Sequence, residues 1–456
     1  MKPTLTARAA ALRFRLAGRE DGATRRAAAA ALPAIERPLF LELVQGLERR
    51  RLTLERVLAS RGDRGRLHLS RVAHAAGLLG IYQILFLDGM PEHAAVDATV
   101  DLVPPRDRGR GFVNAALRGL LRDRRPIVGD PSVIPATRRL RIGPDRWVDL
   151  GRPTFTDPAA DPLAWLAEHE GFETEAAALF IREFGAELAA RILAQANERP
   201  RLVLRRSDAA LDDETFVQEL AEEGLRVRPL GADHPALFVR ESGGDPAETA
   251  AFRRGAYLVQ GPFAARVADF VALREDEVLI DLCAAPGTKS VVLAGQAPRG
   301  RVVACVLDAS GAAAVEENAR RLGLENVAVA RIEAAGPVPT VAKATALLVD
   351  APCSNSGVLA RRPGARRRLG AGPLAELETL QMSLLDRALT WLEGAPARSR
   401  LVWSTCSIFE RENGGLLRRA LEGRPNLVLA AEIRDLPLRP EDDGGYAARI
   451  EKRPGA

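Results

Sequence analysis

The sequence predicts a multidomain chain with an all-helical N-terminal domain, a small α+β subdomain and a C-terminal α/β domain built on a doubly wound parallel sheet. The chain has 456 residues, of which 47% are hydrophobic, enough for about three domains with cores of their own. Apolar residues recur at helical spacing in the first 145 positions, whereas beyond residue 254 short apolar runs alternate with helical segments. We place the domains at residues 1–145, 146–253 and 254–456.

The N-terminal domain is expected to be helical throughout. Residues 72–86 are rich in apolar residues and predict a central helix, and Pro91 is expected to open the next helix, 92–102. Between residues 110 and 121 the apolar side chains form one stripe, which predicts an amphipathic helix packed on a core. The run Arg49–Arg51 has two interpretations, as phosphate contacts or as a solvated helix face.

The middle of the chain changes character twice. Residues 127–161 are rich in Pro, Gly and Asp and show little periodicity, which predicts a linker or loose loops. Residues 162–197 return to helical spacing. Strands are then expected at 202–206 and 237–240, on either side of a helix at about 213–223, so that this part forms a small α+β subdomain.

Short apolar strands dominate the C-terminal domain, which we expect to begin near residue 254. They are expected at about 278–282, 301–307, 326–330, 345–349 and 399–404. Segments with helical spacing separate them, which is typical of a parallel sheet with helices on both faces. Residues 426–433 and 444–450 predict an antiparallel hairpin at the edge of that sheet.

Polar or thiol side chains follow four of these strands. The turn Asp281–Ser290 contains small residues, Pro and Gly and leads into a helix, which places free backbone N–H groups where open parallel sheets hold nucleotides. Asp308 ends the next strand, about twenty residues on, where an acidic side chain can hold ribose hydroxyls. We therefore expect a nucleotide-like cofactor here. The turn is neither a G-x-G-x-x-G nor a Walker loop, so a plain strand-to-helix connection is the alternative.

Composition narrows the class of protein. The charge balance is 65 basic against 60 acidic residues, or +5, which permits a polyanionic partner without requiring one. The four cysteines have no C-x-x-C spacing and no His at metal-ligand spacing, so we expect neither a metal site nor disulfides. The first residues lack the apolar stretch of a signal peptide, and no apolar run is long enough to span a bilayer. We expect a cytoplasmic monomer that does not bind membranes.

Three motifs carry a resemblance to a known family. They are CAAPGTKS at residues 283–290, DAPCSNSGV at 350–358 and STCSIFEREN at 404–413. These segments resemble, in order and spacing, the CAAPGGKT-like, DAPCSGTGV-like and STCS…EEN signatures of the S-adenosylmethionine-dependent RNA cytosine-5 methyltransferases. The resemblance implies a Rossmann-like class I methyltransferase domain with S-adenosyl-L-methionine as its cofactor.

The N-terminal third carries a second resemblance. Residues 42–51, 82–96 and 111–118 are similar to parts of the NusB-like RNA-binding domain that precedes the methyltransferase domain in bacterial 16S ribosomal RNA enzymes of the RsmB/Sun type. This similarity implies that the partner is ribosomal RNA, most simply that of the small subunit. A methyltransferase that acts on transfer RNA is one alternative, and a non-catalytic RNA-binding or ribosome-assembly factor with a decayed cofactor site is another.

The chemistry of cytosine methylation suits a pair of cysteines. C5 of cytosine is a poor nucleophile, but a thiolate that adds to C6 turns the ring into an enamine whose C5 can attack a methyl group. By resemblance, Cys406 is that nucleophile, and Cys353 assists removal of the C5 proton and release of the product. Asp350 is implied to bind the cytosine edge, and Lys289 to favour the thiolate or hold the base. The alternatives are that both cysteines are buried small hydrophobes and that Asp350 caps a turn.

The resemblance also implies a set of cofactor-binding residues. They are Cys283, Ala284, Ala285, Pro286, Gly287, Thr288, Lys289, Asp308, Glu333 and Asp350. Three positions depart from the family pattern: Thr288 and Gly261 stand where Gly and Asp are usual, and Glu333 lies in the region of a missing Gly-Asp pair. The basic segment 361–368 is interpreted either as a border of the RNA backbone or as a solvated loop.

Overall fold

The computed structural model describes residues 5–18, 22–62, 69–89, 91–207 and 211–453. The chain divides into two compact units, residues 1–198 and 199–456. The three-domain division predicted from the sequence stays a prediction, and its boundaries do not coincide with these units. The helices expected at 162–197 belong to the first unit, and the α+β subdomain belongs to the second.

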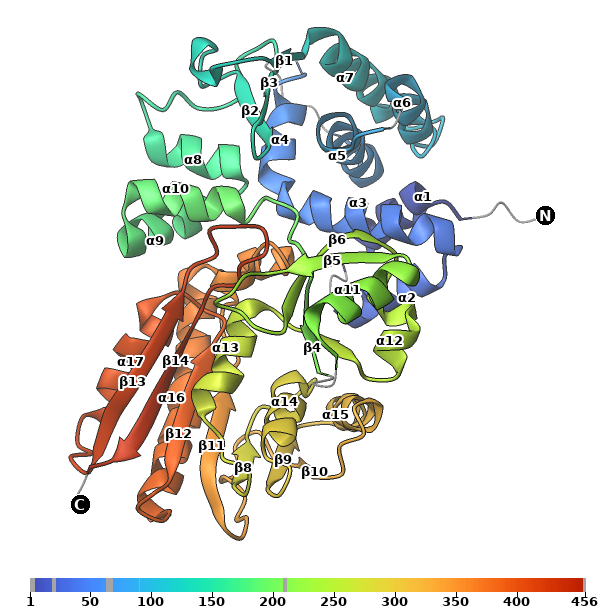
Figure 1. Cartoon of the computed structure of the whole chain (residues 1–456). Coiled ribbons are helices and arrows are strands. Elements are labelled where there is room, and N and C mark those ends of the chain that lie inside the picture. The colour runs from blue at the N-terminus through green and yellow to red at the C-terminus, as the bar shows by residue number, and fades with distance from the viewer. Residues whose placement is uncertain (1–4, 19–21, 63–68, 90, 208–210, 454–456) are drawn as a thin grey trace. The chain divides into compact units, whose positions relative to one another are not determined.

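Helices make up most of the first unit. They are α1 (Ala7–Ala17), α2 (Gly22–Ala30), α3 (Arg37–Arg49), α4 (Arg51–Ala59), α5 (Arg71–Phe86), α6 (Glu92–Val100), α7 (Gly109–Asp123), α8 (Pro162–Glu170), α9 (Thr174–Phe184) and α10 (Ala186–Gln195). The predicted central helix is confirmed as α5, which is buried and packs against α1, α3, α4, α6 and α7 (Figure 1). Close approach there requires glycine, because a Cβ on Gly46 of α3 would lie 1.9 Å from the ring of Tyr82.

The structure corrects the prediction for the segment after α7. This segment contains strands β1 (Arg125–Ile127), β2 (Arg139–Gly143) and β3 (Arg146–Asp149), which form an antiparallel sheet in the order β1-β3-β2. The domain is therefore not helical to residue 145, and residues 127–161 are more than loose loops. Leu140 and Val148 are buried against the helical core, so tertiary packing stabilises strands that the high Pro and Gly content concealed.

Both interpretations of the Arg49–Arg51 run are wrong for its first two members. Arg49 and Arg50 are only 3% and 2% exposed. The guanidinium of Arg50 lies 4.8 Å from the ring centroid of Phe86, and burial lowers the pKa of Arg50 to about 10. These two arginines therefore belong to the interior and cannot contact a phosphate backbone.

A four-stranded antiparallel sheet opens the second unit. Its strands are β4 (Val203–Arg206), β5 (Leu225–Pro229), β6 (Leu237–Gly243) and β7 (Tyr257–Val259), in the order β5-β6-β4-β7. Helix α11 (Asp213–Glu222) packs on this sheet through Phe216 and Leu220, as expected for the α+β subdomain, and the short helix α12 (Ala250–Arg253) precedes β7. Sequence reasoning missed β5 and β7, which are short and depend on pairing with β6 and β4.

The large sheet confirms the doubly wound prediction. Its strands are β8 (Val278–Asp281), β9 (Arg301–Val306), β10 (Val327–Arg331), β11 (Ala344–Asp350), β12 (Arg400–Thr405), β13 (Leu427–Asp435) and β14 (Gly445–Lys452). The order is β10-β9-β8-β11-β12-β14-β13, in which β8 to β12 are parallel and the β13–β14 hairpin is antiparallel at the edge. All five predicted strands and the hairpin are therefore present.

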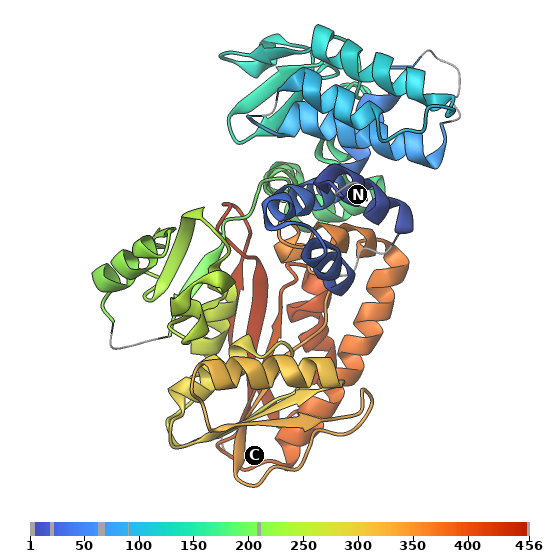
Figure 2. The same ribbon diagram turned by 90° about the vertical axis from the view of Figure 1, so that its right-hand side faces the viewer.

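Helices cover both faces of this sheet. Helices α13 (Pro262–Val271) and α14 (Thr288–Gln296) pack on one face with Leu279 and Leu348, and α15 (Ala309–Arg321) packs beside them. Helices α16 (Ala371–Gly394) and α17 (Gly414–Leu421) cover the other face, against Ile280, Leu347 and Trp403. In Figure 2 the long helix α16, in orange, runs alongside the sheet. Parallel strands covered on both faces deliver their carboxyl ends to one edge, where a site can form.

A buried ion pair lies at the amino-terminal ends of the parallel strands, on the side of the sheet opposite to their carboxyl ends. Arg400, at the start of β12, donates to Glu277 through two nitrogens, at 3.0 and 2.7 Å, and Thr345 adds a third hydrogen bond at 3.1 Å. The two ionic side chains are only 9% and 3% exposed. Burial opposes the charge, but the bonds from Arg400 and a backbone N–H outweigh it and lower the pKa of Glu277 to about 2.

We expect this pair to make stability depend on pH in the acid range. Because the folded pKa is depressed from 4.5, its contribution is complete above about pH 4.5 and is lost as the pH falls towards 2. Glu277→Gln should lower the free energy of unfolding at pH 7 by about 3 kcal/mol, since it leaves Arg400 buried without its counter-ion. Urea denaturation at pH 7 and pH 3.5 should show the difference from the wild type shrinking at the lower pH.

The matched control is Glu275→Gln, which removes an exposed ion pair with Arg299 in the same region. Exposed pairs contribute about 0–1 kcal/mol, so this variant should stay close to the wild type at both pH values. Equal losses in the two variants would contradict the assignment.

Candidate active site

Two cysteines meet at the carboxyl ends of adjacent parallel strands. Cys353 follows β11 and Cys406 follows β12, and their Sγ atoms lie 3.2 Å apart. Hydrogen bonding continues beyond the strands, because Ala351 N donates to Ser404 O at 2.8 Å and Gly357 N donates to Cys406 O at 2.9 Å. Cys353 is buried, whereas Cys406 is partly exposed. The structure thus brings together the two thiols that the sequence pointed to.

A cation lies beside this pair. Lys289, in the first turn of α14, donates from Nζ to Oδ2 of Asp350 at 2.6 Å. Burial alone would lower the pKa of Lys289, but Asp350, with smaller contributions from Cys406 and Asp281, raises it above its ordinary value. Lys289 therefore remains positively charged next to Asp350 and Cys406.

The two sulfurs have different surroundings. The hydrogen bond with Cys406, together with burial and the negative charge of Glu412, raises the pKa of Cys353 well above its usual range. Cys353 consequently holds its proton, while Cys406 is the sulfur that is open to a substrate and near the Lys289 ammonium. This difference suits Cys406 as a nucleophile and Cys353 as a neighbouring group that takes part in proton transfer.

Asn355 connects the two cysteines, and sequence reasoning missed it. Its Nδ2 donates to Cys353 O at 2.9 Å, and its Oδ1 accepts from Cys406 Sγ at 3.3 Å and from Arg362 at 3.1 Å. Its φ of +61° lies in the left-handed region, which Gly and Asn tolerate best. The signal was present in the motif, since this Asn stands where the DAPCSGTGV-like signature has Gly.

The predicted cofactor loop forms a tight turn between β8 and α14. Gly287 has a φ of +96°, and a Cβ there would lie 3.0 Å from Val315. At the head of the turn, Asp281 is buried and accepts from Ser290 Oγ at 2.6 Å through Oδ2. Its Oδ1 has no hydrogen-bond partner among the described residues, and burial raises the pKa of Asp281 to about 6. The turn therefore begins at a buried carboxylate with one oxygen that has no side-chain partner among the described residues.

The other predicted cofactor residues lie along the same edge of the sheet. Asp308 follows β9 and caps α15, accepting from Gly311 N at 2.7 Å, and Glu333 lies exposed in the loop after β10. Thr288 is the first residue of α14. Burial raises the pKa of Cys283 to about 12, so this thiol stays protonated. The structure places these residues after neighbouring strands, and their contact with a cofactor stays a prediction.

Comparisons with known proteins show what the two parts of the chain are similar to. The family model described as 16S rRNA methyltransferase RsmB/F matches residues 268–438, and the NusB family model matches residues 7–122. The C-terminal part of the chain is therefore similar to the RsmB/F methyltransferases, and the N-terminal part to the NusB family. The protein is an S-adenosylmethionine-dependent RNA methyltransferase with a NusB-family domain in front of its catalytic domain.

Individual relatives match across nearly the whole chain. Ribosomal RNA small subunit methyltransferase B of Cronobacter sakazakii is 28% identical over 435 residues, which cover 92% of this chain and 91% of the relative. The Citrobacter koseri protein of the same name is 26% identical over 429 residues, with coverage of 92% and 91%.

Solved structures share the fold. The crystal structure of PH0851 has a TM-score of 0.73 at 20% identity and covers 98% of both chains. NSun6 from Pyrococcus horikoshii, crystallised with SFG, has a TM-score of 0.55 at 20% identity and covers 62% of this chain and 99% of its own.

Gly261, where the RsmB/F pattern often has Asp, has a structural explanation. A Cβ on Gly261 would lie 1.5 Å from Oδ2 of Asp443, so the Asp443 carboxylate occupies the space that a side chain at position 261 would need. Asp443 is buried and accepts from Arg361 Nε at 2.5 Å. Position 261 thus lacks an acidic side chain, and the carboxylate of Asp443, from the loop before β14, lies in its place.

The basic segment 361–368 is only partly available to RNA. Arg361 binds Asp443 and the carbonyl oxygens of Arg201 and Glu441, both at 2.9 Å, and Arg366 is only 8% exposed. For buried Arg366, both the RNA-border and the solvated-loop interpretations are wrong, whereas Arg361 is partly exposed and already bound to Asp443. Other arginines in the segment are exposed, and their contact with RNA stays a prediction.

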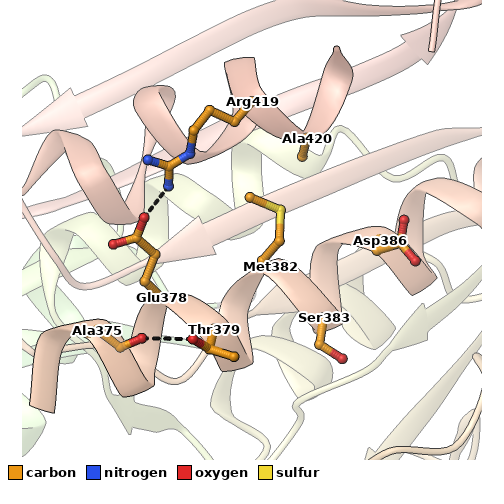
Figure 3. Close-up of a pocket in the computed structure, with 8 residues that line it drawn as sticks. All are labelled: Ala375, Glu378, Thr379, Met382, Ser383, Asp386, Arg419 and Ala420. Carbon is orange, nitrogen blue, oxygen red and sulfur yellow. Dashed lines mark hydrogen bonds and ion pairs between the residues drawn. The ribbon is translucent and has the colours of Figure 1, made fainter. Parts of the chain in front are cut away.

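A separate pocket lies between α16 and α17, with a volume of about 580 Å³ (Figure 3). It is lined by Ala375, Glu378, Thr379, Met382, Ser383, Asp386, Arg419 and Ala420. Glu378 is paired with Arg419 and, at 2.7 Å, with Arg411. None of the predicted site residues lines this pocket, so the geometry of the thiols, and not the cavity, locates the candidate active site.

Within the described part of the chain, no group of three or more His, Cys, Asp or Glu side chains could hold a metal ion. No helix found there is long and apolar enough to cross a membrane.

Proposed function

We propose that the enzyme methylates C5 of a cytosine in small-subunit (16S) ribosomal RNA through a covalent bond between Cys406 and C6 of the base. One observation carries the proposal: two sulfurs lie 3.2 Å apart at adjacent strand ends beside the Lys289–Asp350 pair. Relatives that match over 92% of the chain are named ribosomal RNA small subunit methyltransferase B, which supports the choice of RNA.

The proposed reaction begins at Cys406. Its sulfur adds to C6, and the electrons of the C5–C6 double bond become available at C5, which attacks the methyl group. Loss of the C5 proton then expels the sulfur from C6 and restores the ring. A thiol can reach C6 only when the base has left its stack, so the substrate is a splayed or looped-out nucleotide.

The neighbouring side chains suit the supporting roles. Cys353 lies next to the attacking sulfur, at 3.2 Å, and is therefore placed to assist loss of the C5 proton from a base that is bound to Cys406. Asp350 is one-third exposed and can accept hydrogen bonds from the cytosine edge while Lys289 holds its Oδ2. A base that is hydrogen-bonded to a carboxylate at its protonated N3 is more electrophilic at C6.

The residues present fit S-adenosylmethionine. This cofactor would supply an electrophilic methyl group. The unpartnered Oδ1 of buried Asp281 and the turn at Gly287 can receive its amino-acid part, with the loop from Cys283 to Lys289 alongside. Asp308 can hold ribose hydroxyls, with Glu333 and Asp350 as the further acidic contacts. We also propose that the enzyme acts in the cytoplasm as a monomer.

Bisulfite sequencing of ribosomal and transfer RNA, from strains with and without the gene, tests the substrate. We expect one 5-methylcytosine in small-subunit RNA to disappear in the deletion strain and to return with the wild-type gene, but not with Cys406→Ala. Loss of methylation in transfer RNA alone would replace the proposal with the transfer RNA alternative. Unchanged methylation in both RNAs would refute it.

A further inference from the structure

A buried carboxylate lies directly beneath the two thiols. Glu412 ends a short 3₁₀ helix, Glu410–Glu412, and its side chain is fully buried. It accepts from Ser354 N at 2.8 Å and from Ser354 Oγ at 2.6 Å, and it also accepts from Ser407 Oγ. Ser354 follows Cys353 in the chain, and Ser407 follows Cys406, so one carboxylate binds the residue after each thiol.

Two further side chains extend this arrangement to the other side of each cysteine. Gln381 of α16 donates from Nε2 to Glu412 at 3.0 Å and to Pro352 O at 2.9 Å, immediately before Cys353. Asn413 accepts from Thr405 Oγ1 at 2.6 Å and donates to Ser407 O at 2.9 Å, on either side of Cys406. Both thiol-bearing loops are therefore held from both ends.

Because burying the Glu412 carboxylate costs free energy, the groups that donate to it must hold defined positions. A buried carboxylate is strongly destabilising unless hydrogen bonds satisfy it, and the donors to Glu412 come from β11's loop, β12's loop and α16. A shift of either loop would leave an acceptor or a hydroxyl unpaired in the interior. The position of one loop therefore constrains the other.

We propose that Glu412 is a positioning residue that sets the distance between Cys353 and Cys406. It does so by binding the residue that follows each thiol, so that both sulfurs are presented to the same base. Its importance for catalysis rests on the proposed function, but the distance between the sulfurs can be tested without RNA. The alternative is that the Glu412 network only stabilises the fold.

The test compares Glu412→Gln with Glu410→Gln. Glu410 belongs to the same short helix, but its ion pairs with Arg418 and Arg434 lie at the surface and do not involve the cysteine loops. The first readout is the rate at which diamide couples Cys353 to Cys406. The two thiols lose two hydrogen atoms, which reduce diamide to the hydrazine, and the disulfide is quantified by mass spectrometry after alkylation and proteolysis.

Positioning predicts a selective effect. Disulfide formation should slow on the order of tenfold in Glu412→Gln, because the bond requires close sulfurs in a narrow geometry, and it should be unchanged in Glu410→Gln. The dissociation constant for S-adenosylmethionine, measured by calorimetry, should stay within about twofold, since Glu412 makes no contact with the cofactor loop. With an RNA substrate, kcat should fall about 100-fold with little change in KM.

Two results would overturn the proposal. An unchanged disulfide rate in Glu412→Gln is one, and a parallel loss of cofactor binding, which indicates general misfolding, is the other. If Glu412→Gln does not fold, Ser354→Ala and Ser407→Ala remove one hydroxyl each and carry the same test, with unchanged rates in both again overturning it. Because the disulfide readout needs no RNA, its outcome is independent of whether ribosomal RNA is the substrate.

Discussion

Cys406→Ala is expected to abolish methyl transfer to RNA, with a loss of more than about a thousandfold. Without the Cys406 sulfur no bond to C6 can form, and C5 remains part of an aromatic ring too electron-poor to attack a methyl group. Cys353 cannot take over, since it is buried and its pKa is raised well above the usual range. The measurement is transfer of a tritiated methyl group from S-adenosylmethionine to small-subunit ribosomal RNA.

Cys305→Ala is the matched control. Cys305 lies buried in β9, away from the strand ends that carry the two thiols. Removing its sulfur should cost about 1 kcal/mol of stability and leave the rate of methyl transfer unchanged. Substantial activity in Cys406→Ala, or equal losses in the two variants, would show that Cys406 is not the nucleophile.

Cys353→Ala is expected to trap a covalent enzyme–RNA adduct. Cys406 can still add to C6 in this variant, and C5 can still be methylated, but the step that removes the C5 proton and expels the sulfur loses its assisting group. The adduct should appear as a slower band on a denaturing gel when RNA and S-adenosylmethionine are both present. Product formation should fall correspondingly.

The control for the trapped adduct is the double variant Cys353→Ala/Cys406→Ala, which should give no shifted band. An adduct that forms with Cys406→Ala alone would reverse the two roles. That outcome would also conflict with the exposure of the sulfurs, because Cys406 is the more accessible of the two.

The strands that carry the site could be predicted because their signals are local. The apolar runs that became β8, β9, β11 and β12 are buried on both faces, so each reads as a continuous hydrophobic segment. Parallel pairing then brings their carboxyl ends to one edge whatever the remaining details. Cys353 and Cys406 could be placed near each other on this reasoning.

Elements that depend on distant partners were missed or misread. The sheet β1–β3 lies in a Pro- and Gly-rich segment, and its strands are stabilised by packing of Leu140 and Val148 against the helical core. Arg50 looked like a surface charge, yet it packs against Phe86 in the interior, and Arg361 is engaged by Asp443, which is far away in sequence. A run of charged residues can be seen in the sequence, but whether its side chains are buried depends on which distant segments pack against them.

The sequence by itself determined the fold class of each part, the strand ends that carry chemistry and the pair of thiols, because hydrophobic periodicity and motif spacing are properties of short segments. Only the tertiary structure decided how the thiols differ and what holds them. Cys353 is buried while Cys406 is open, and Asn355 and Glu412 join loops about fifty residues apart. Hydrogen bonds between segments so far apart exist only after the sheet has assembled, so no local pattern could reveal them.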